Sequence, residues 1–443
     1  MMSRPVVAIV GRPNVGKSTL FNKLCGKRLA IVDDTPGVTR DRIFGDCEWL
    51  GHNMMLVDTG GIEPYSDDII LSQMRSQAQL AIDSADVIIM LTDIRDGIVA
   101  TDREVATMLQ KSGKPIVLAV NKCDTTGELP PDFYEFYNLG LGDPIAVSAT
   151  HGRGTGDLLD AVLAFLPKDA GEDYEDDTIK VAIIGKPNVG KSSLVNAICG
   201  ENRVIVSDIA GTTRDATDTA VENEYGKFVF IDTAGLRRKA RITEEIERYS
   251  VIRTVAAVER CDVAVVVIDA AEGVTEQDAK IAGIAHERGK GIIIAVNKWD
   301  SIEKNDKTIY EHRNRIREIL SFIPYAEIVF ISAVTGQRLT KLYEEIDKVI
   351  ENQNKRIGTG ILNEIMMEAT VLQQPPTDKG RRLKLFYVTQ VSVKPPTFVI
   401  FVNDKKLMHF SYTRYIENKF REAFGFDGTS VKFIIRERNE EKN

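Results

Sequence analysis

The sequence predicts an α/β protein: two domains with mostly parallel sheets, each covered by helices on both faces, followed by a small α+β domain. The first observation is an internal repeat, because residues 7–26 return at 181–200 with a spacing of 174 residues that holds as far as Asp58 and Asp232. The second is that strand-length apolar runs alternate with segments of helical periodicity in both copies, as expected of parallel sheets buried on both faces. The third is that this alternation ends after residue 352.

The two copies predict matching sets of strands. In the first copy they include 6–10, 54–57, 87–91, 116–120 and 145–147, with a helix over 102–110. In the second they include 181–184, 228–231, 263–268, 292–296 and 328–331, with a helix over 276–286. The acidic segment 168–177 lacks a hydrophobic period and predicts a flexible linker between domains 1–167 and 178–352.

Residues 353–443 predict a third domain, preceded by a short helical stretch at 340–352. Its expected order is helix 361–370, strand 382–391, strand 397–402, helix 412–424 and strand 430–435. Pro395 and Pro396 separate the two strands, because proline does not fit inside a central strand.

Charge is distributed unevenly along the chain. The whole sequence carries a formal charge of −8, whereas residues 355–443 hold 16 Lys and Arg against 10 Asp and Glu. A basic terminal domain on an acidic body predicts a polyanionic partner, but a merely solvated surface explains the charge equally well.

Composition excludes two other classes of protein. The longest apolar runs are strand-sized, so no membrane segment is expected, and the N-terminus enters a strand directly, so no signal peptide is expected. The five cysteines show no metal-ligand spacing, which favours reduced, buried thiols in a cytoplasmic protein.

A phosphate-binding loop pattern, Gly-x-x-x-x-Gly-Lys-Ser, follows an apolar strand and opens a helix in each copy, which is the context that this motif requires. Glycine lets backbone N–H groups face phosphate oxygens, and the helix N-terminus adds a favourable dipole. The lysine is expected to reach the β- and γ-phosphates and the serine to bind Mg²⁺. The loops consist of Gly11, Arg12, Pro13, Asn14, Val15, Gly16, Lys17 and Ser18, and of Gly185, Lys186, Pro187, Asn188, Val189, Gly190, Lys191 and Ser192.

An Asp-x-x-Gly follows a strand in each copy, where a second carboxylate is needed to organise Mg²⁺. The glycine would allow a backbone amide close to the γ-phosphate. A threonine upstream could bind Mg²⁺ only while the γ-phosphate is present, and so order its loop. These residues are Thr39, Asp58, Thr59, Gly60, Gly61 and Ile62 in the first copy, and Thr213, Asp232, Thr233, Ala234, Gly235 and Leu236 in the second.

An Asn-Lys-x-Asp motif closes a later strand in each copy and predicts the base. Its carboxylate can accept hydrogen bonds from the N1–H and 2-amino groups of guanine, which adenine does not offer. A Ser-Ala pair after the next strand could present a backbone amide to guanine O6. The residues are Asn121, Lys122, Cys123, Asp124, Ser148 and Ala149, and Asn297, Lys298, Trp299, Asp300, Ser332 and Ala333. Each copy is therefore predicted to bind GTP or GDP.

With these motifs in place, the chain resembles the Der (EngA) family of tandem G-domain GTPases over nearly its whole length. The Gly-x-Pro-Asn-x-Gly-Lys-Ser loops, their duplication and the small basic third domain carry the resemblance. It implies a cytoplasmic, Mg²⁺-dependent GTPase that associates with the large ribosomal subunit and its rRNA during maturation, with a KH-like third domain. We expect no membrane partner and a monomer in solution.

The source of catalytic power is a separate question. Many GTPases orient the attacking water with a glutamine after the Asp-x-x-Gly, but this chain has Ile62 and Leu236 there. In similar proteins, an asparagine of the phosphate loop helps to hold a K⁺ ion that supplies positive charge to the transition state. The resemblance therefore implies K⁺ stimulation through Asn14 and Asn188, and the candidate catalytic residues are Asn14, Lys17, Thr39, Asn188, Lys191 and Thr213.

The third domain departs from the usual KH pattern, in which a Gly-x-x-Gly loop clamps RNA. Its only such match, Gly425 to Gly428, follows the second helix and predicts a helix cap and turn instead. Contact with RNA is then expected from basic side chains, namely Arg381, Arg382, Lys384, Lys405, Lys406 and Arg414. The basic run 237–241 could add contacts that depend on the nucleotide, although a solvated loop is an equal alternative.

Three functions fit these observations. The leading one is a GTP-driven switch that acts on a ribosomal precursor. An RNA-binding scaffold that holds GTP or GDP as structural ligands is the second. A tRNA-modifying GTPase is disfavoured, because nothing resembling a separate modification domain flanks the two copies.

Overall fold

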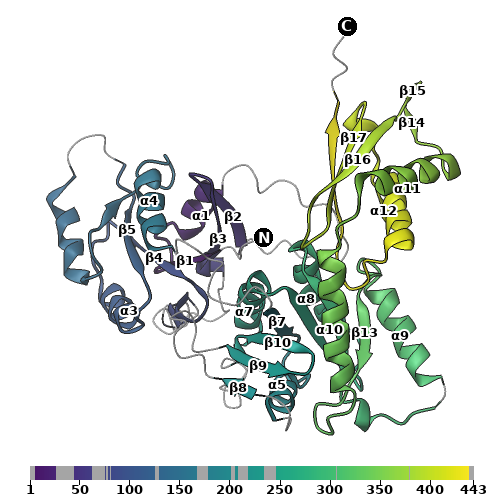
Figure 1. Ribbon diagram of the computed structural model, residues 1–443. Helices are drawn as coiled ribbons and strands as arrows, with labels where there is room; N and C mark the ends of the chain where they lie inside the picture. The colour runs from purple at the N-terminus through teal and green to yellow at the C-terminus, as the bar shows by residue number, and fades with distance from the viewer. Residues whose placement is uncertain are drawn as a thin grey trace. The chain divides into compact units, whose positions relative to one another are not determined.

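The computed structural model (Figure 1) has three sheets of more than two strands, two of them large, as the sequence predicts. It describes residues 5–25, 44–61, 75, 78–79, 81–124, 129–166, 178–200, 205–207, 218–233, 246–305, 307–378 and 380–438. Contacts divide the chain into two compact units. One holds the first sheet, and the other holds the second sheet together with the C-terminal domain.

The first sheet has the strand order β2-β3-β1-β4-β5-β6. All neighbours run parallel except β2, which pairs antiparallel with β3 at the edge. The strands are β1 (Val6–Val10), β2 (Phe44–Trp49), β3 (His52–Asp58), β4 (Val87–Asp93), β5 (Ile116–Asn121) and β6 (Ile145–Ala146). The helices include α1 (Lys17–Cys25), η2 (Thr59–Gly61), α3 (Ala100–Lys111), η3 (Pro131–Leu139) and α4 (Thr155–Phe165).

The second sheet repeats this plan with the order β13-β12-β11-β7-β10-β9-β8. Its strands are β7 (Ile179–Ile184), β8 (Ile205–Ser207), β9 (Thr219–Asn223), β10 (Gly226–Ile231), β11 (Val263–Asp269), β12 (Gly291–Asn297) and β13 (Glu327–Phe330). The helices include α5 (Lys191–Gly200), α7 (Ile246–Arg260), α8 (Glu276–Glu287), η5 (Trp299–Ser301), α9 (Thr308–Ile319) and α10 (Leu339–Asn354). Buried clusters lie on both faces of this sheet, which explains the nearly continuous apolar runs.

The C-terminal domain follows the predicted order of elements. Its sheet has the order β16-β17-β18, in which β16 and β17 are antiparallel and β17 and β18 are parallel. Its elements are α11 (Thr359–Leu372), β14 (Thr377–Asp378), β15 (Arg381–Arg382), β16 (Leu385–Ser392), β17 (Thr397–Val402), η6 (Lys405–Leu407), α12 (Phe410–Phe424) and β18 (Lys432–Glu437).

Two features of the sheets were not predicted. The antiparallel edge strands β2, β8 and β9 escaped notice because an edge strand buries one face only, so it shows no continuous apolar run: β2 alternates buried Cys47 with exposed Glu48. The strand predicted over 382–391 is divided, because Arg381 and Arg382 pair with Thr377 and Asp378 in a separate hairpin.

The cysteines and helices agree with the composition. All five cysteines are free thiols, and four of them are buried. Burial raises the pKa of the Cys47 thiol to about 11, so that it stays protonated and acts as an apolar side chain. Among the described residues, no helix combines the length and apolar character that crossing a bilayer needs.

Candidate nucleotide sites

Both phosphate loops lie at the carboxyl end of a central strand. The first follows β1, which pairs with β3 on one side and β4 on the other, and the second follows β7, which lies between β10 and β11. Because these strands are parallel, the loops after β4, β5 and β6 reach the same edge of the sheet. Ligands of open α/β sheets bind at this edge, where the direction of strand order reverses.

The backbone of the two loops is nearly identical. Asn14 and Asn188 have left-handed φ values of 66° and 65°, a conformation that asparagine tolerates better than most residues. Gly16 and Gly190 both have a φ of 96°, and a Cβ atom at either position would lie within 2.4 Å of the Nδ2 atom of an asparagine. These glycines are therefore required both by backbone conformation and by a close neighbour.

The lysine of each loop is folded back over it. The Lys17 ammonium donates hydrogen bonds to the carbonyl oxygens of Gly11, at 2.6 Å, and Arg12, at 2.8 Å. The Lys191 ammonium donates to those of Gly185, at 2.7 Å, and Lys186. In both sites, a positive charge is held beside a helix N-terminus, an arrangement suited to phosphate oxygens.

The Mg²⁺ candidates of the first site lie together. The Ser18 hydroxyl donates to a carboxylate oxygen of Asp58 at 2.6 Å, and the Gly60 N–H donates to the other oxygen at 2.8 Å. Two hard oxygen ligands beside a phosphate loop fit Mg²⁺, which usually takes few protein ligands and completes its shell with phosphate and water. Asp58 is 2% exposed, so a cation here would offset the cost of burying its charge.

The corresponding aspartate of the second site is held differently. Asp232 has a left-handed φ of 55°, and its N–H donates to Asp218 at 2.9 Å. The hydroxyl groups of Thr219 and Thr233 lie 2.6 Å apart beside it, whereas Thr59 of the first site donates to the Ile9 carbonyl. Six predicted site residues lie outside the described residues: Thr39, Ile62, Thr213, Ala234, Gly235 and Leu236.

The asparagine of each Asn-Lys-x-Asp motif joins the phosphate loop to the base-binding loop. Asn121 donates to the Val15 carbonyl at 2.7 Å and accepts from the Ala149 N–H at 3.0 Å. Asn297 makes the same two bonds, to Val189 and from Ala333, at 2.9 Å each. Both asparagines are buried. The predicted Ser-Ala segments are thus in place, and one amide side chain sets their distance from the phosphate loop.

The base-reading carboxylates stand next to serine hydroxyls. Ser148 donates to Asp124 at 2.6 Å, and this hydrogen bond lowers the pKa of the Asp124 carboxyl. The hydrogen bond from Ser332 likewise lowers the pKa of Asp300. Both carboxylates are therefore ionised at neutral pH and keep lone pairs for the two N–H donors of guanine.

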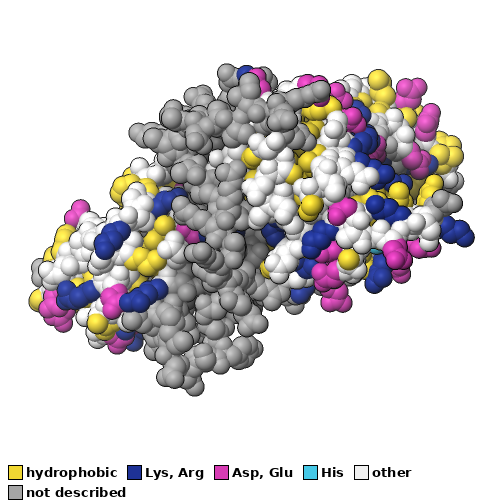
Figure 2. All heavy atoms as spheres, turned by 90° about the horizontal axis from the view of Figure 1, so that it is seen from below, with side chains coloured by type: hydrophobic (Ala, Val, Ile, Leu, Met, Phe, Trp, Pro, Cys, Tyr) yellow, Lys and Arg dark blue, Asp and Glu magenta, His cyan; other side chains and the backbone are white. Residues whose placement is uncertain are grey.

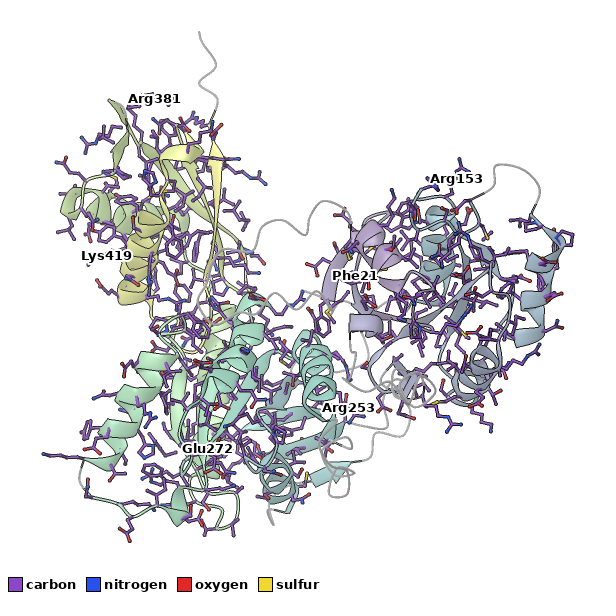
Figure 3. All side chains as sticks on the ribbon, turned by 180° about the vertical axis from the view of Figure 1, so that it is seen from behind. Phe21, Arg153, Arg253, Glu272, Arg381 and Lys419 are labelled. Carbon is purple, nitrogen blue, oxygen red and sulfur yellow. The ribbon has the colours of Figure 1, made fainter. Side chains whose placement is uncertain are left out.

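The first site carries two arginines at this carboxylate. Arg95 pairs with a carboxylate oxygen of Asp124 at 2.8 Å, and Arg153, labelled in Figure 3, donates to the Asp124 carbonyl at 2.9 Å. The repeat places Ala271 at the position of Arg95, so this ion pair has no counterpart in the second site.

Sequence reasoning missed a pair of aspartates that hold the lysines of these motifs. Asp93, at the end of β4, pairs with Lys122 at 2.5 Å, and Asp269, at the end of β11, pairs with Lys298 at 2.6 Å. Burial alone would raise the pKa of Asp269, but the hydrogen bond from Lys298 lowers it. The signal was available, since both aspartates and both lysines recur at a spacing of 176 residues.

A second missed pair anchors the phosphate loops to helices α3 and α8. Arg12 lies 3.6 Å from Asp102, and Lys186 lies 3.5 Å from Asp278. Both aspartates are fully buried, and burial raises the pKa of each. These aspartates also sit at the third position of their helices, where they accept the hydrogen bond of a capping box.

The residues predicted to contact RNA are spread over several elements. Arg381 and Arg382 form β15, Lys405 and Lys406 begin η6, and all of these side chains are exposed, as are Lys384 and Arg414. Arg381 pairs with Asp404 at 3.1 Å, and Figure 3 shows it at the outer end of its domain, far from Glu272. On the face in Figure 2, Lys and Arg side chains are mixed with Asp and Glu, so no single-sign patch stands out there. The run 237–241 lies outside the described residues.

Duplicated phosphate loops on mostly parallel sheets, each tied to a guanine-reading carboxylate, define a tandem P-loop GTPase. Residues 6–122 and 180–298 match a family described as 50S ribosome-binding GTPase, and residues 356–436 match one described as KH-domain-like of EngA bacterial GTPase enzymes, C-terminal. GTPase Der of Lachnoclostridium phytofermentans is 69% identical over 439 residues, which are 99% of this chain and 100% of the relative. GTPase Der of Agathobacter rectalis is 67% identical over the same shares.

The chain belongs to the GTPase Der (EngA) family. It is therefore an enzyme that hydrolyses GTP, and the predicted family and fold class are confirmed. A solved structure of a variant of Aquifex aeolicus Era is 22% identical, with a TM-score of 0.30, and covers 59% of this chain and 93% of its own, which is too distant to bear on function.

Proposed function

We propose that the chain is a GTP-driven switch in the maturation of the large ribosomal subunit, and that its second nucleotide site controls the C-terminal domain. One observation carries this proposal: strand β12 belongs to both. Its last residue, Asn297, ties the second phosphate loop to the base-binding loop. At its start, the Ile292 N–H donates to the Gly428 carbonyl at 2.7 Å, and the Gly428 N–H donates to the Tyr325 carbonyl at 2.7 Å.

The contact around Gly428 is dense enough to transmit a displacement. The Arg421 guanidinium lies 4.4 Å from the centre of the Tyr325 ring, and it donates to the carbonyl oxygens of Phe426 and Thr429 at 3.0 Å. The Tyr325 hydroxyl in turn lies 2.7 Å from the His286 ring. Since packed interiors respond to displacement as units, a shift of β12 moves the C-terminal domain with it.

This contact also accounts for Gly425 to Gly428. Gly425 ends α12, as the sequence predicts, and its N–H donates to the Arg421 carbonyl. Gly428 is buried, with a φ of 74°, and a Cβ atom there would lie 2.1 Å from Val349. The Gly-x-x-Gly segment is thus used for docking onto the second G domain, so RNA contact must lie elsewhere in the C-terminal domain.

Binding to the ribosome is tested by sedimentation. Purified large subunits are centrifuged with the full chain loaded with a non-hydrolysable GTP analogue, GDP or no nucleotide. We expect the analogue-loaded chain to pellet with the subunits and the GDP-loaded chain to remain in the supernatant. Equal pelleting under all three conditions would contradict the switch, although GTP hydrolysis would stand. A partner of this kind also implies that the chain works in the cytoplasm, where ribosomes assemble.

Mg²⁺ and K⁺ complete the proposed chemistry. Ser18, Thr39 and Asp58 would hold Mg²⁺ in the first site, and Ser192, Thr213 and Asp232 in the second. Mg²⁺ neutralises charge on the β- and γ-phosphates. We expect faster GTP hydrolysis in potassium than in sodium chloride, and Asn14→Ala with Asn188→Ala to abolish the difference. Equal rates of the unaltered chain in both salts would overturn the role of K⁺.

A further inference from the structure

One face of the C-terminal sheet is left uncovered by the helices of its own domain. Helices α11 and α12 pack on the other face, where Val388, Phe398 and Ile400 form the core with residues of both helices (Figure 1). Because side chains alternate along a strand, the neighbours of these residues stand on the opposite face. There, Tyr387 is 37% exposed and Ile434 is 42% exposed.

The uncovered face carries aromatic rings beside arginines. Tyr387 and Phe401 are cross-strand partners whose rings are stacked, with centroids 4.3 Å apart and an angle of 13° between planes. Arg436 is the partner of Phe401 on β18. The Arg438 guanidinium lies 5.8 Å from the centre of the Phe386 ring. A register shift between Leu385 and Tyr387 allows Phe386 to join this face.

The charge of this face has one sign. Arg436 and Arg438 lie on it, and the described positions of β16, β17 and β18 that share it hold no carboxylate. Glu437, between the two arginines, alternates to the other side and accepts a hydrogen bond from the Lys405 N–H at 2.9 Å. By contrast, cations on α12 are paired within the helix, Lys419 with Glu422 and Arg421 with Glu417.

We propose that this sheet face binds single-stranded RNA, with bases stacked on Tyr387 and Phe401 and the phosphate backbone contacted by Arg436 and Arg438. Aromatic rings on an open sheet, interleaved with cations and free of carboxylates, match the way in which sheet surfaces take up unpaired bases. The Gly-x-x-Gly segment cannot serve instead, because Gly428 is buried against Val349. This assignment deepens the proposed function and rests on it.

The test measures binding of a fluorescein-labelled oligouridylate of about 12 nucleotides to the full chain by anisotropy. Tyr387→Ala is expected to weaken binding about 5- to 100-fold, the range found for loss of one base-stacking ring. Its matched control is Tyr310→Ala, which removes a tyrosine of α9 that is 65% exposed, and which should leave affinity unchanged.

The arginines have a separate readout. Arg436→Gln with Arg438→Gln should reduce the slope of log affinity against log salt by about 1.4, because each phosphate contact to a single strand contributes about 0.7. The control pair, Arg313→Gln with Arg315→Gln on α9, carries the same charge change and should leave the slope as it is.

Each outcome decides the assignment. Tight binding by the unaltered chain that neither variant weakens would place RNA elsewhere and overturn it, as would no binding at all. If Tyr387→Ala leaves RNA affinity unchanged but alters GTP turnover, the face contacts a protein neighbour such as the first G domain, and the proposal is wrong. Nucleotide-dependent pelleting with large subunits is measured separately, so the proposed function can stand while this assignment fails.

Discussion

Replacing Asn297 by alanine removes the side chain that joins the two loops of the second nucleotide site. Two buried backbone groups then lose their partners, the Val189 carbonyl and the Ala333 N–H. Val189 is 1% exposed and Ala333 is 7% exposed, so water reaches them poorly. An unsatisfied buried polar group costs about 1–3 kcal/mol, which gives a loss of about 2–6 kcal/mol in the free energy of unfolding.

Part of this loss should appear in nucleotide binding, because GDP must then order loops that Asn297 had ordered. We expect the affinity of the second site for a fluorescent GDP analogue to fall at least about tenfold, or about 1.4 kcal/mol. The first site keeps Asn121 and serves as the internal reference, and Asn121→Ala should reverse the pattern. Titration should therefore show one unchanged and one weakened site in each variant.

A matched control comes from Asn363 on α11, which donates to the Val388 carbonyl and accepts from the Val388 N–H at 2.9 Å each. Asn363→Ala removes the same two types of hydrogen bond far from either loop, so it should lower the free energy of unfolding and leave both GDP affinities intact. If Asn297→Ala and Asn363→Ala behave alike in the titration, Asn297 does not position the nucleotide loops.

Three further changes test other parts of the structure. Asp300→Asn should move the second site from GTP to XTP by about a hundredfold or more, since an amide donates to the 2-oxo group of xanthine and clashes with the 2-amino group of guanine; competition binding should still find GTP at Asp124. Burial lowers the pKa of His286 to about 4, below an unfolded value of about 6.5, so the unfolded chain takes up the proton first; unfolding free energy should fall by about 2 kcal/mol from pH 7 to pH 5, and His286→Gln should flatten this slope in urea titrations. Gly428→Ala should destabilise the unit by about 2–5 kcal/mol in denaturant unfolding, because alanine is strained at a φ of 74° and its Cβ meets Val349; an unchanged midpoint would contradict the docking role.

Much of the nucleotide sites could be predicted because their parts are local. The phosphate loop and its lysine lie within eight consecutive residues, and the repeat showed which Asp-x-x-Gly and Asn-Lys-x-Asp matches belonged together. The two anchoring pairs were not predicted, because Asp93 meets Lys122, and Asp102 meets Arg12, only once separate strands and helices come to one edge of the sheet. Predictions for Thr39 and Thr213 and the domain boundaries remain predictions, and helix α10 continues to Asn354, beyond the boundary drawn at 352.

The sequence by itself determined two guanine-nucleotide sites and the order of elements in the C-terminal domain, because short-range spacing and periodicity encode both. Tertiary structure decided what those elements contact. Gly428 resembles part of an RNA clamp in sequence, but its N–H and C=O are used by Tyr325 and Ile292, residues more than 100 positions away. Tyr387 and Phe401 look like ordinary strand residues until the sheet places their rings together on a face that the helices leave open. Such contacts depend on which faces are buried, and that is settled only when the whole unit packs.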